Sequence, residues 1–198
     1  MGLPLREASL WDPPDAVLVD GGVYPIRTDY RAGIAYSMAS LDGSLTPQRL
    51  LDIWFPGPVP ANFAAAQEAV NAFCRRAEDA PISSRDGPMP YSYLADAGAI
   101  FAAFQRVYRI DLSTAQMHWW RFMALLEGLI THNFEDRVQY RITEPGKIKD
   151  KARREHFRRM RRLYQLDERG LPASEQEPMT LEEYERWMID RAVGRKER

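Results

Sequence analysis

The pattern of apolar and polar positions predicts a mainly helical fold built around one buried helix at residues 111–130. On a helical wheel, the apolar side chains of this stretch, DLSTAQMHWWRFMALLEGLI, form two faces separated by narrow polar seams. A helix that is apolar on two sides is buried between neighbours instead of lying on a surface. Trp119 and Trp120 fall on opposite faces, so we expect both side chains to be buried against different neighbours.

Shorter patterns predict the elements on either side of this helix. Two β-prone runs at 16–19 and 23–26 flank Asp20-Gly21-Gly22, which is typical of the tight turn of a hairpin. The expected helices cover residues 30–41, 47–55, 62–77, 95–108 and 147–164, with a short helix or turn at 132–140. The residues expected in the core are Phe101, Phe104, Trp119, Trp120, Phe122 and Leu126. The predicted fold class is therefore mainly α, a single multi-helix domain with a small N-terminal β-hairpin.

Three parts follow from this organisation. Residues 1–15 form a proline-marked leader, residues 16–166 the helical domain, and residues 167–198 an extension. The extension begins with a linker-like sequence, and Thr180-Leu181-Glu182-Glu183 then matches a capping box that opens a final helix. We expect this last helix either to dock on the domain or to bind a partner.

Charge is unevenly distributed along the chain, although the net charge is only −1. Residues 147–164 carry nine basic and two acidic side chains, whereas the segments before and after them are acidic. The predicted basic stripe, on one side of this helix, consists of Lys147, Lys151, Arg154, Arg158, Arg161 and Arg162. The opposite, apolar side consists of Ile148, Ala152, His156, Met160, Leu163 and Tyr164.

The basic stripe has three interpretations. It could neutralise the phosphates of a nucleic acid, dock an acidic protein helix, or remain a solvated face or one folded back on the acidic remainder of the chain. An isoelectric point near 6.3 and the absence of aromatic residues among the arginines argue against nucleic acid. The stripe is nevertheless the one feature of the sequence that indicates a function, so its six residues are the candidate partner-binding site.

Length and composition fit one globular domain of 198 residues. The single cysteine, Cys74, excludes an intramolecular disulfide and belongs to the apolar stripe of the 62–77 helix, so we expect it in the core. The N-terminus shows no signal-peptide pattern, and no run approaches the roughly 18–20 apolar residues of a membrane span. A cytoplasmic protein without a membrane anchor is expected.

No catalytic or metal-binding motif is visible. The three histidines, His118, His132 and His156, are isolated and lack metal-ligand spacing, and we expect His118 to be a hydrogen-bonded structural residue. No Gly-rich phosphate loop, nucleophile elbow or CxxC pair occurs. We therefore expect no enzymatic activity, no metal and no cofactor.

Several stretches in order resemble the siphophage proteins called gene product fifteen. They are Tyr24–Arg31, Tyr91-Ser92-Tyr93, Ile100–Phe104, Tyr108–Leu112, His118–Phe122, Tyr140-Arg141, Lys147–Lys151 and Leu163-Tyr164. The resemblance covers about residues 16–166. The chain departs from it in the proline-dense loops at 56–60 and 81–90 and in the extension after Leu166.

The resemblance implies a tail assembly chaperone encoded beside the tape-measure gene of a phage or prophage. Such a protein binds the tape-measure protein, together with other tail assembly proteins, in the host cytoplasm and is absent from the virion. The family offers no catalytic residues to carry over. The alternative function is a nucleic-acid-binding or DNA-packaging accessory protein that uses residues 147–164, whereas the chaperone reading allows only weak, non-specific nucleic-acid binding.

Overall fold

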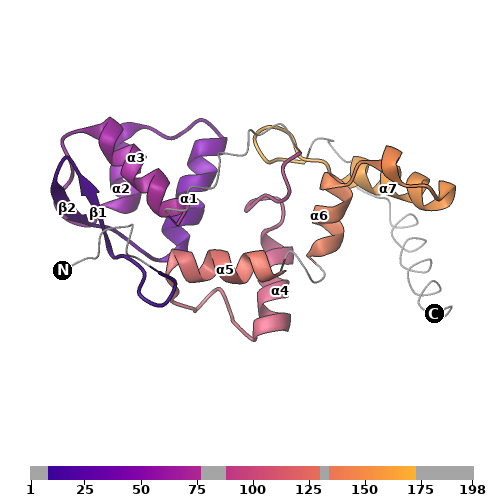
Figure 1. Ribbon diagram of the computed structural model, residues 1–198, viewed down its shortest axis with the longest axis horizontal. Coiled ribbons are helices and arrows are strands. Elements are labelled where there is room, and N and C mark those ends of the chain that lie inside the picture. Colours follow the sequence, from indigo (N-terminus) through magenta and orange to yellow (C-terminus); the bar gives the residue numbers. More distant parts are fainter. Residues whose placement is uncertain (1–8, 77–87, 130–133, 173–198) are drawn as a thin grey trace.

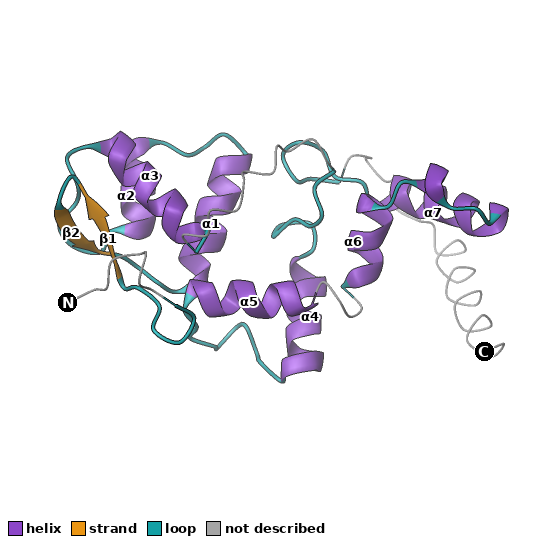
Figure 2. Cartoon of the chain, in the orientation of Figure 1, coloured by secondary structure: helices purple, strands orange, loops and turns teal. Residues whose placement is uncertain are grey.

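The computed structural model describes residues 9–76, 88–129 and 134–172 (Figure 1). Over these ranges the chain is mainly helical with one antiparallel hairpin, which confirms the predicted fold class (Figure 2). The elements are β1 (Ala16–Val19), β2 (Gly22–Pro25), α1 (Tyr30–Leu41), α2 (Pro47–Trp54), α3 (Phe63–Cys74), α4 (Ala97–Tyr108), α5 (Trp119–Leu129), α6 (Glu135–Ile142), the 3₁₀ turn η1 (Pro145–Lys147) and α7 (Lys151–Tyr164). The final helix predicted after residue 180 lies outside the described residues.

Local sequence signals account for the N-terminal elements. The hairpin turns at Asp20 and Gly21, whose φ angles of 48° and 79° suit the primed turn that matches the twist of two strands. Side-chain oxygens of Asp29, Thr46 and Asn62 accept hydrogen bonds from the first turns of α1, α2 and α3. These three helices therefore start where their capping residues predict.

The central helix is shorter than predicted, because α5 begins at Trp119 and not at residue 111. Asp111 closes a local turn by accepting hydrogen bonds from the backbone and hydroxyl of Ser113. The chain then pairs with the segment before α1, where Tyr30 N donates to Met117 O (3.0 Å) and Trp119 N donates to Thr28 O (2.6 Å). Bonds to a segment distant in sequence thus replace the first helical turns.

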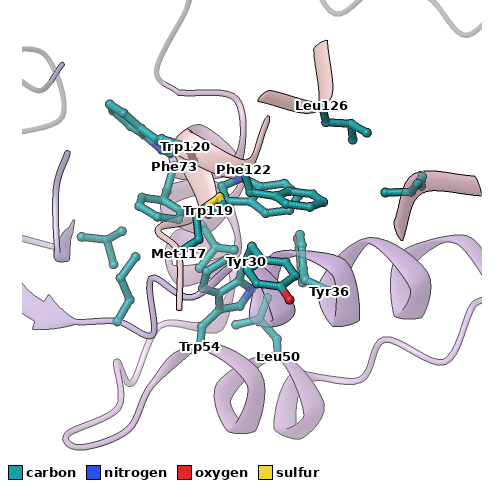
Figure 3. Packing of buried hydrophobic residues seen from close by; sticks show 14 of the residues in the cluster. Tyr30, Tyr36, Leu50, Trp54, Phe73, Met117, Trp119, Trp120, Phe122 and Leu126 are labelled. Carbon is teal, nitrogen blue, oxygen red and sulfur yellow. Dashed lines mark hydrogen bonds between the residues drawn. The ribbon is translucent and has the colours of Figure 1, made fainter. Parts of the chain in front are cut away.

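The core is built around the start of α5 (Figure 3). Phe122 stacks on Tyr30, Phe104 and Trp119, with ring centroids 4.8, 5.3 and 5.8 Å away. Trp120 instead packs against Phe73 of α3, at 5.9 Å. The predicted core residues Phe104, Trp119, Trp120, Phe122 and Leu126 are all buried.

The two adjacent tryptophans also donate hydrogen bonds to the same helix, α3. The indole N–H of Trp119 donates to Cys74 O (3.2 Å), and that of Trp120 donates to Phe73 O (2.8 Å). These carbonyls lie in the last turn of α3, where no further helical turn is available to donate N–H groups to them. The pair of indoles therefore caps α3 while filling the core.

Phe101 does not belong to the core, contrary to the prediction. It is 39% exposed, whereas Ile100, Ala103 and Phe104 form the buried stripe of α4. Phe101 lies beside this stripe on the helix surface, and the wheel alone did not show how narrow the buried face is.

Helices α6 and α7 lie at the end of the molecule opposite the hairpin (Figure 1). Phe134 and Val138 join α6 to the core. The chain does not leave the domain at Leu166, because Leu166 pairs with Pro172 around a turn closed by Asp167. Gly170 is buried there, and a Cβ at this position would lie 3.2 Å from both Met89 Sδ and Ser92 Oγ. The first residues of the predicted linker thus pack on the domain.

Candidate partner-binding surface

The basic helix begins later than predicted. Pro145, Gly146 and Lys147 form the 3₁₀ turn η1, so Lys147 lies outside α7, and its ammonium is 2.9 Å from the Glu144 carboxylate. The carboxylate of Asp150 then caps α7 by accepting from Arg153 N (2.6 Å). Of the predicted stripe, Lys147 is therefore held in a local ion pair.

Helix α7 lies on the domain without burying any of its side chains. The half-buried side chains on its packed face are Arg154, Phe157, Met160, Arg161 and Tyr164. The predicted apolar side is rotated from this face by roughly a quarter turn at 100° per residue. Ala152, His156 and Leu163 consequently remain exposed, Leu163 by 38%.

Aromatic contacts to α6 explain this orientation. The ring of Tyr140 lies 5.1 Å from Phe157 and stacks on Tyr164 at 6.0 Å. Its hydroxyl is 3.2 Å from His156 Nε2. The guanidinium of Arg137 lies 5.2 Å above the Tyr164 ring, a further attraction between α6 and α7. The residues that attach the helix are Tyr164, which the wheel put on the apolar side, and Phe157, which it put at the border of that side.

A buried ion pair ties the end of α7 to the core. Arg141 donates to both oxygens of Asp96, at 2.6 and 3.1 Å, and also to Tyr164 O (2.5 Å) and Pro90 O (3.1 Å). Arg137 reaches the same carboxylate at 3.2 Å. Burial alone would raise the pKa of Asp96, but hydrogen bonds from Arg141, Ser92 N and Arg137 together lower it below its usual value.

Sequence reasoning did not find this pair. Asp96 precedes α4 and resembles a helix cap, yet it makes no capping hydrogen bond. Arg141 appeared only within the family resemblance, and neither residue stands out by spacing or periodicity. We interpret the pair as structural and not as a reactive site, because the hydrogen-bonding groups of both side chains already have partners within the protein.

A groove of about 730 Å³ runs between α6 and α7. Its apolar parts are contributed by Tyr140, Ile148 and Phe157, and its polar lining residues are Asp136, Gln139, Thr143, Arg153 and His156. Such a mixture can hold an apolar side chain while its rim fixes orientation by hydrogen bonds.

The predicted basic stripe divides into two sets. Arg154 donates to Ile148 O at 2.8 Å, Lys147 pairs with Glu144, and Arg161 is half-buried on the packed face. These cations are used within the molecule. Lys151, Arg158 and Arg162 are exposed and, among the residues that the structure describes, form no ion pair. We call the second set the free cations, and together with the groove they form the candidate site, the α6–α7 surface.

Within the described residues, neither the cysteine nor a cluster of metal-ligand side chains offers a competing site. Burial raises the pKa of the Cys74 thiol to about 12, which keeps it protonated and unreactive. The described ranges contain no group of His, Cys, Asp or Glu side chains that could hold a metal ion. Within those ranges no helix is long and apolar enough to cross a membrane.

Comparison with known protein families gives a match to this chain. The family model described as "Bacteriophage Gp15 protein" matches residues 12–166. Neither the search of curated proteins nor that of solved structures returned a match. Because the matched range includes every element from β1 to α7 and well over half of the chain, this protein belongs to the bacteriophage Gp15 family.

Proposed function

We propose that this phage protein is a non-enzymatic tail assembly chaperone that binds the tape-measure protein through the α6–α7 surface. The observation that carries the proposal is that α7, an amphipathic helix, buries none of its side chains and borders a groove. A helix that serves only the fold normally buries its apolar stripe. The resemblance to proteins encoded beside a tape-measure gene supports the choice of the tape-measure protein as partner and of the host cytoplasm as the compartment.

The surface suits an amphipathic helix with acidic flanks. Apolar side chains of such a partner would enter the groove beside Tyr140 and Phe157, as in other helix-in-groove complexes. Lys151, Arg158 and Arg162 would face its acidic residues and favour one orientation. A tape-measure protein, which is long and exposes apolar helical stripes before the tube encloses it, offers many such segments.

The test is co-expression with tape-measure fragments followed by a pull-down. We expect the wild-type protein to retain at least one fragment in solution, and the Arg158→Glu/Arg162→Glu variant to bind it at least tenfold more weakly. The matched control is Arg106→Glu/Arg121→Glu, which makes the same charge change on exposed positions of α4 and α5. Circular dichroism melts should be unchanged, since exposed charges contribute little to stability.

Two results would contradict the chaperone function. One is that no tape-measure fragment is retained by the wild-type protein. The other is that tails of normal length assemble when the gene is silenced.

The free cations also keep a second candidate open, nucleic-acid binding through α7. Neutralising about three or four phosphates predicts a loss of affinity of roughly 40–150-fold between 50 and 200 mM salt. Nanomolar DNA binding at 150 mM salt that disappears in Arg158→Glu/Arg162→Glu would favour this function. Weak binding at low salt alone agrees with the chaperone.

A further inference from the structure

The chain itself carries a segment whose chemistry complements the α6–α7 surface. Residues 173–190 contain six acidic side chains and one basic one, a net charge of −5, whereas residues 147–164 have a net charge of +7. Between these acidic residues stand Leu181, Tyr184, Trp187 and Met188, spaced three or four positions apart along most of the run. That spacing brings apolar side chains onto one helical face, which is the pattern a helix-binding groove accepts.

The point where the described chain ends makes this segment available to the surface. Pro172 pairs with Leu166, two residues beyond the end of α7, and the turn between them is packed on residues 89–92. From this anchor, the eight residues 173–180 can span up to about 26–29 Å. A helix of the length of α7 measures about 21 Å. Residues 181–190 can therefore reach any part of the helix.

The family match adds an independent argument. It ends at residue 166, so the surface lies within the shared part of the family, while the acidic segment lies outside the match. This segment lies outside the family match, carries apolar side chains and has a charge opposite to that of α7. It is therefore suited to bind the α6–α7 surface of its own chain.

We propose that residues 181–190 bind the α6–α7 surface of their own chain, with apolar side chains at the groove and acidic ones opposite Lys151, Arg158 and Arg162. In this arrangement the extension covers the surface until a partner displaces it. The interaction is intramolecular and electrostatic in its steering, so it weakens with salt and does not depend on protein concentration. No tape-measure protein is needed to observe it.

The test is limited proteolysis of the full chain with chymotrypsin, measuring by mass spectrometry the rate of cleavage after Tyr184 and Trp187. We expect cleavage of the wild type to be at least tenfold slower at 50 mM than at 500 mM salt. Arg158→Glu/Arg162→Glu should be cleaved at least tenfold faster than the wild type at 50 mM salt. Arg106→Glu/Arg121→Glu, with the same net charge, should keep the wild-type rate.

A charge swap separates contact from a general effect of charge. Glu182→Arg/Glu185→Arg alone should be cleaved rapidly, and adding Arg158→Glu/Arg162→Glu should slow cleavage again at the same target sequence. Equal rates in the wild type and the α7 variant would overturn the proposal, as would failure of the swap to restore protection. Protection that grows with protein concentration would also overturn it, because a second copy would then be the occupant.

Discussion

At position 33 of α1, the space for a side chain is already filled by the ring of Trp119. A Cβ at Gly33 would lie 2.1 Å from Trp119 Cε3, a distance that neither group can accept without moving. Gly33 is helical and has no positive φ, so its backbone does not require glycine. Glycine is required instead because α1 and α5 approach each other closely at this position.

Gly33→Ala should therefore destabilise the protein, although glycine to alanine inside a helix ordinarily stabilises by about 0.5–1 kcal/mol. We expect a loss of about 1–3 kcal/mol from overpacking, measured by urea unfolding. Gly98→Ala is the matched control, since nothing lies within 4 Å of a Cβ there and the same change should stabilise. A Gly33→Ala protein as stable as Gly98→Ala would contradict the packing.

His118 has a defined role at the start of α5. Its Nδ1 accepts from Trp120 N (3.0 Å), so its Nε2 carries the proton and donates to Pro14 O (3.1 Å). Burial lowers the pKa of the ring, while the bond to Pro14 O and the charge of Asp15 oppose this effect. The folded protein thus holds the neutral imidazole, as the sequence interpretation of a structural histidine expected.

Stability should fall as the pH drops below about 6.5, the ordinary histidine pKa. A lowered folded-state pKa means that the unfolded chain binds the proton first, so the contribution of His118 is complete above that pH. Between pH 7 and 5, thermal melts of the wild type should lose more stability than those of His118→Asn. Asparagine can cap the helix but does not titrate. Equal pH dependence in both proteins would contradict the assignment.

On the scale of elements, the Asp96–Arg141 pair joins four parts of the chain that share no sequence pattern. Arg141 on α6 holds the start of α4, the end of α7 and the loop at Pro90 with one guanidinium. Both side chains are almost fully buried: Arg141 is 3% exposed and Asp96 0%. A buried charge without its partner is costly, so these elements stay together as a unit.

Asp96→Asn should cost about 3–5 kcal/mol of unfolding free energy, because it leaves the Arg141 charge buried without a counterion. Arg137→Met removes the half-exposed contact to Asp96 and the cation–π contact to Tyr164, and should cost no more than about 2 kcal/mol. In the double variant Asp96→Leu/Arg141→Met, the loss should be smaller than the sum of the single losses. Additive losses, measured by denaturant unfolding, would show that the pair does not act as one unit.

On the scale of the whole molecule, the boundary of the folded domain lies beyond the boundary that composition predicted. The turn from Leu166 to Pro172 packs through Gly170 against Met89 and Ser92. This polar, glycine-containing sequence resembles a linker. Of residues 165–172 only Gly170 is buried, so no apolar side chain in the sequence marks its contact with the domain.

Two truncations distinguish these boundaries. A chain ending after Pro172 should melt within about 2 °C of the full-length protein. A chain ending after Leu166 should melt several degrees lower, because it loses the Gly170 contact and the bonds that Asp167 accepts from the backbone of Arg169 and Leu171. Circular dichroism melts at equal concentration compare them, and identical melting points for the two truncations would refute the revised boundary.

Sequence reasoning succeeded where the cause is local. Asp29, Thr46 and Asn62 bond to backbone groups within three residues, so their helices could be placed from the sequence. It failed where distant segments decide, as at the start of α5, where Thr28 and Tyr30 bind the backbone that helix formation would otherwise use. The helical wheel of α7 predicted its basic and apolar sides but not which side faces the domain. That orientation depends on Tyr140 of α6, which packs against Phe157 and Tyr164.

The capping of α3 by α5 has a consequence for the order of events during synthesis. The carbonyls of Phe73 and Cys74 receive their indole donors only after a further 45 residues have been made, from Cys74 to Trp119. At roughly 5–20 residues per second this takes about 2–9 s. During that interval the hairpin and the first three helices lack both the ring that fills the space beside Gly33 and the cap of α3. Nascent chains stalled before residue 119 should thus be digested rapidly by protease, and protection should arise only once α5 has left the ribosome.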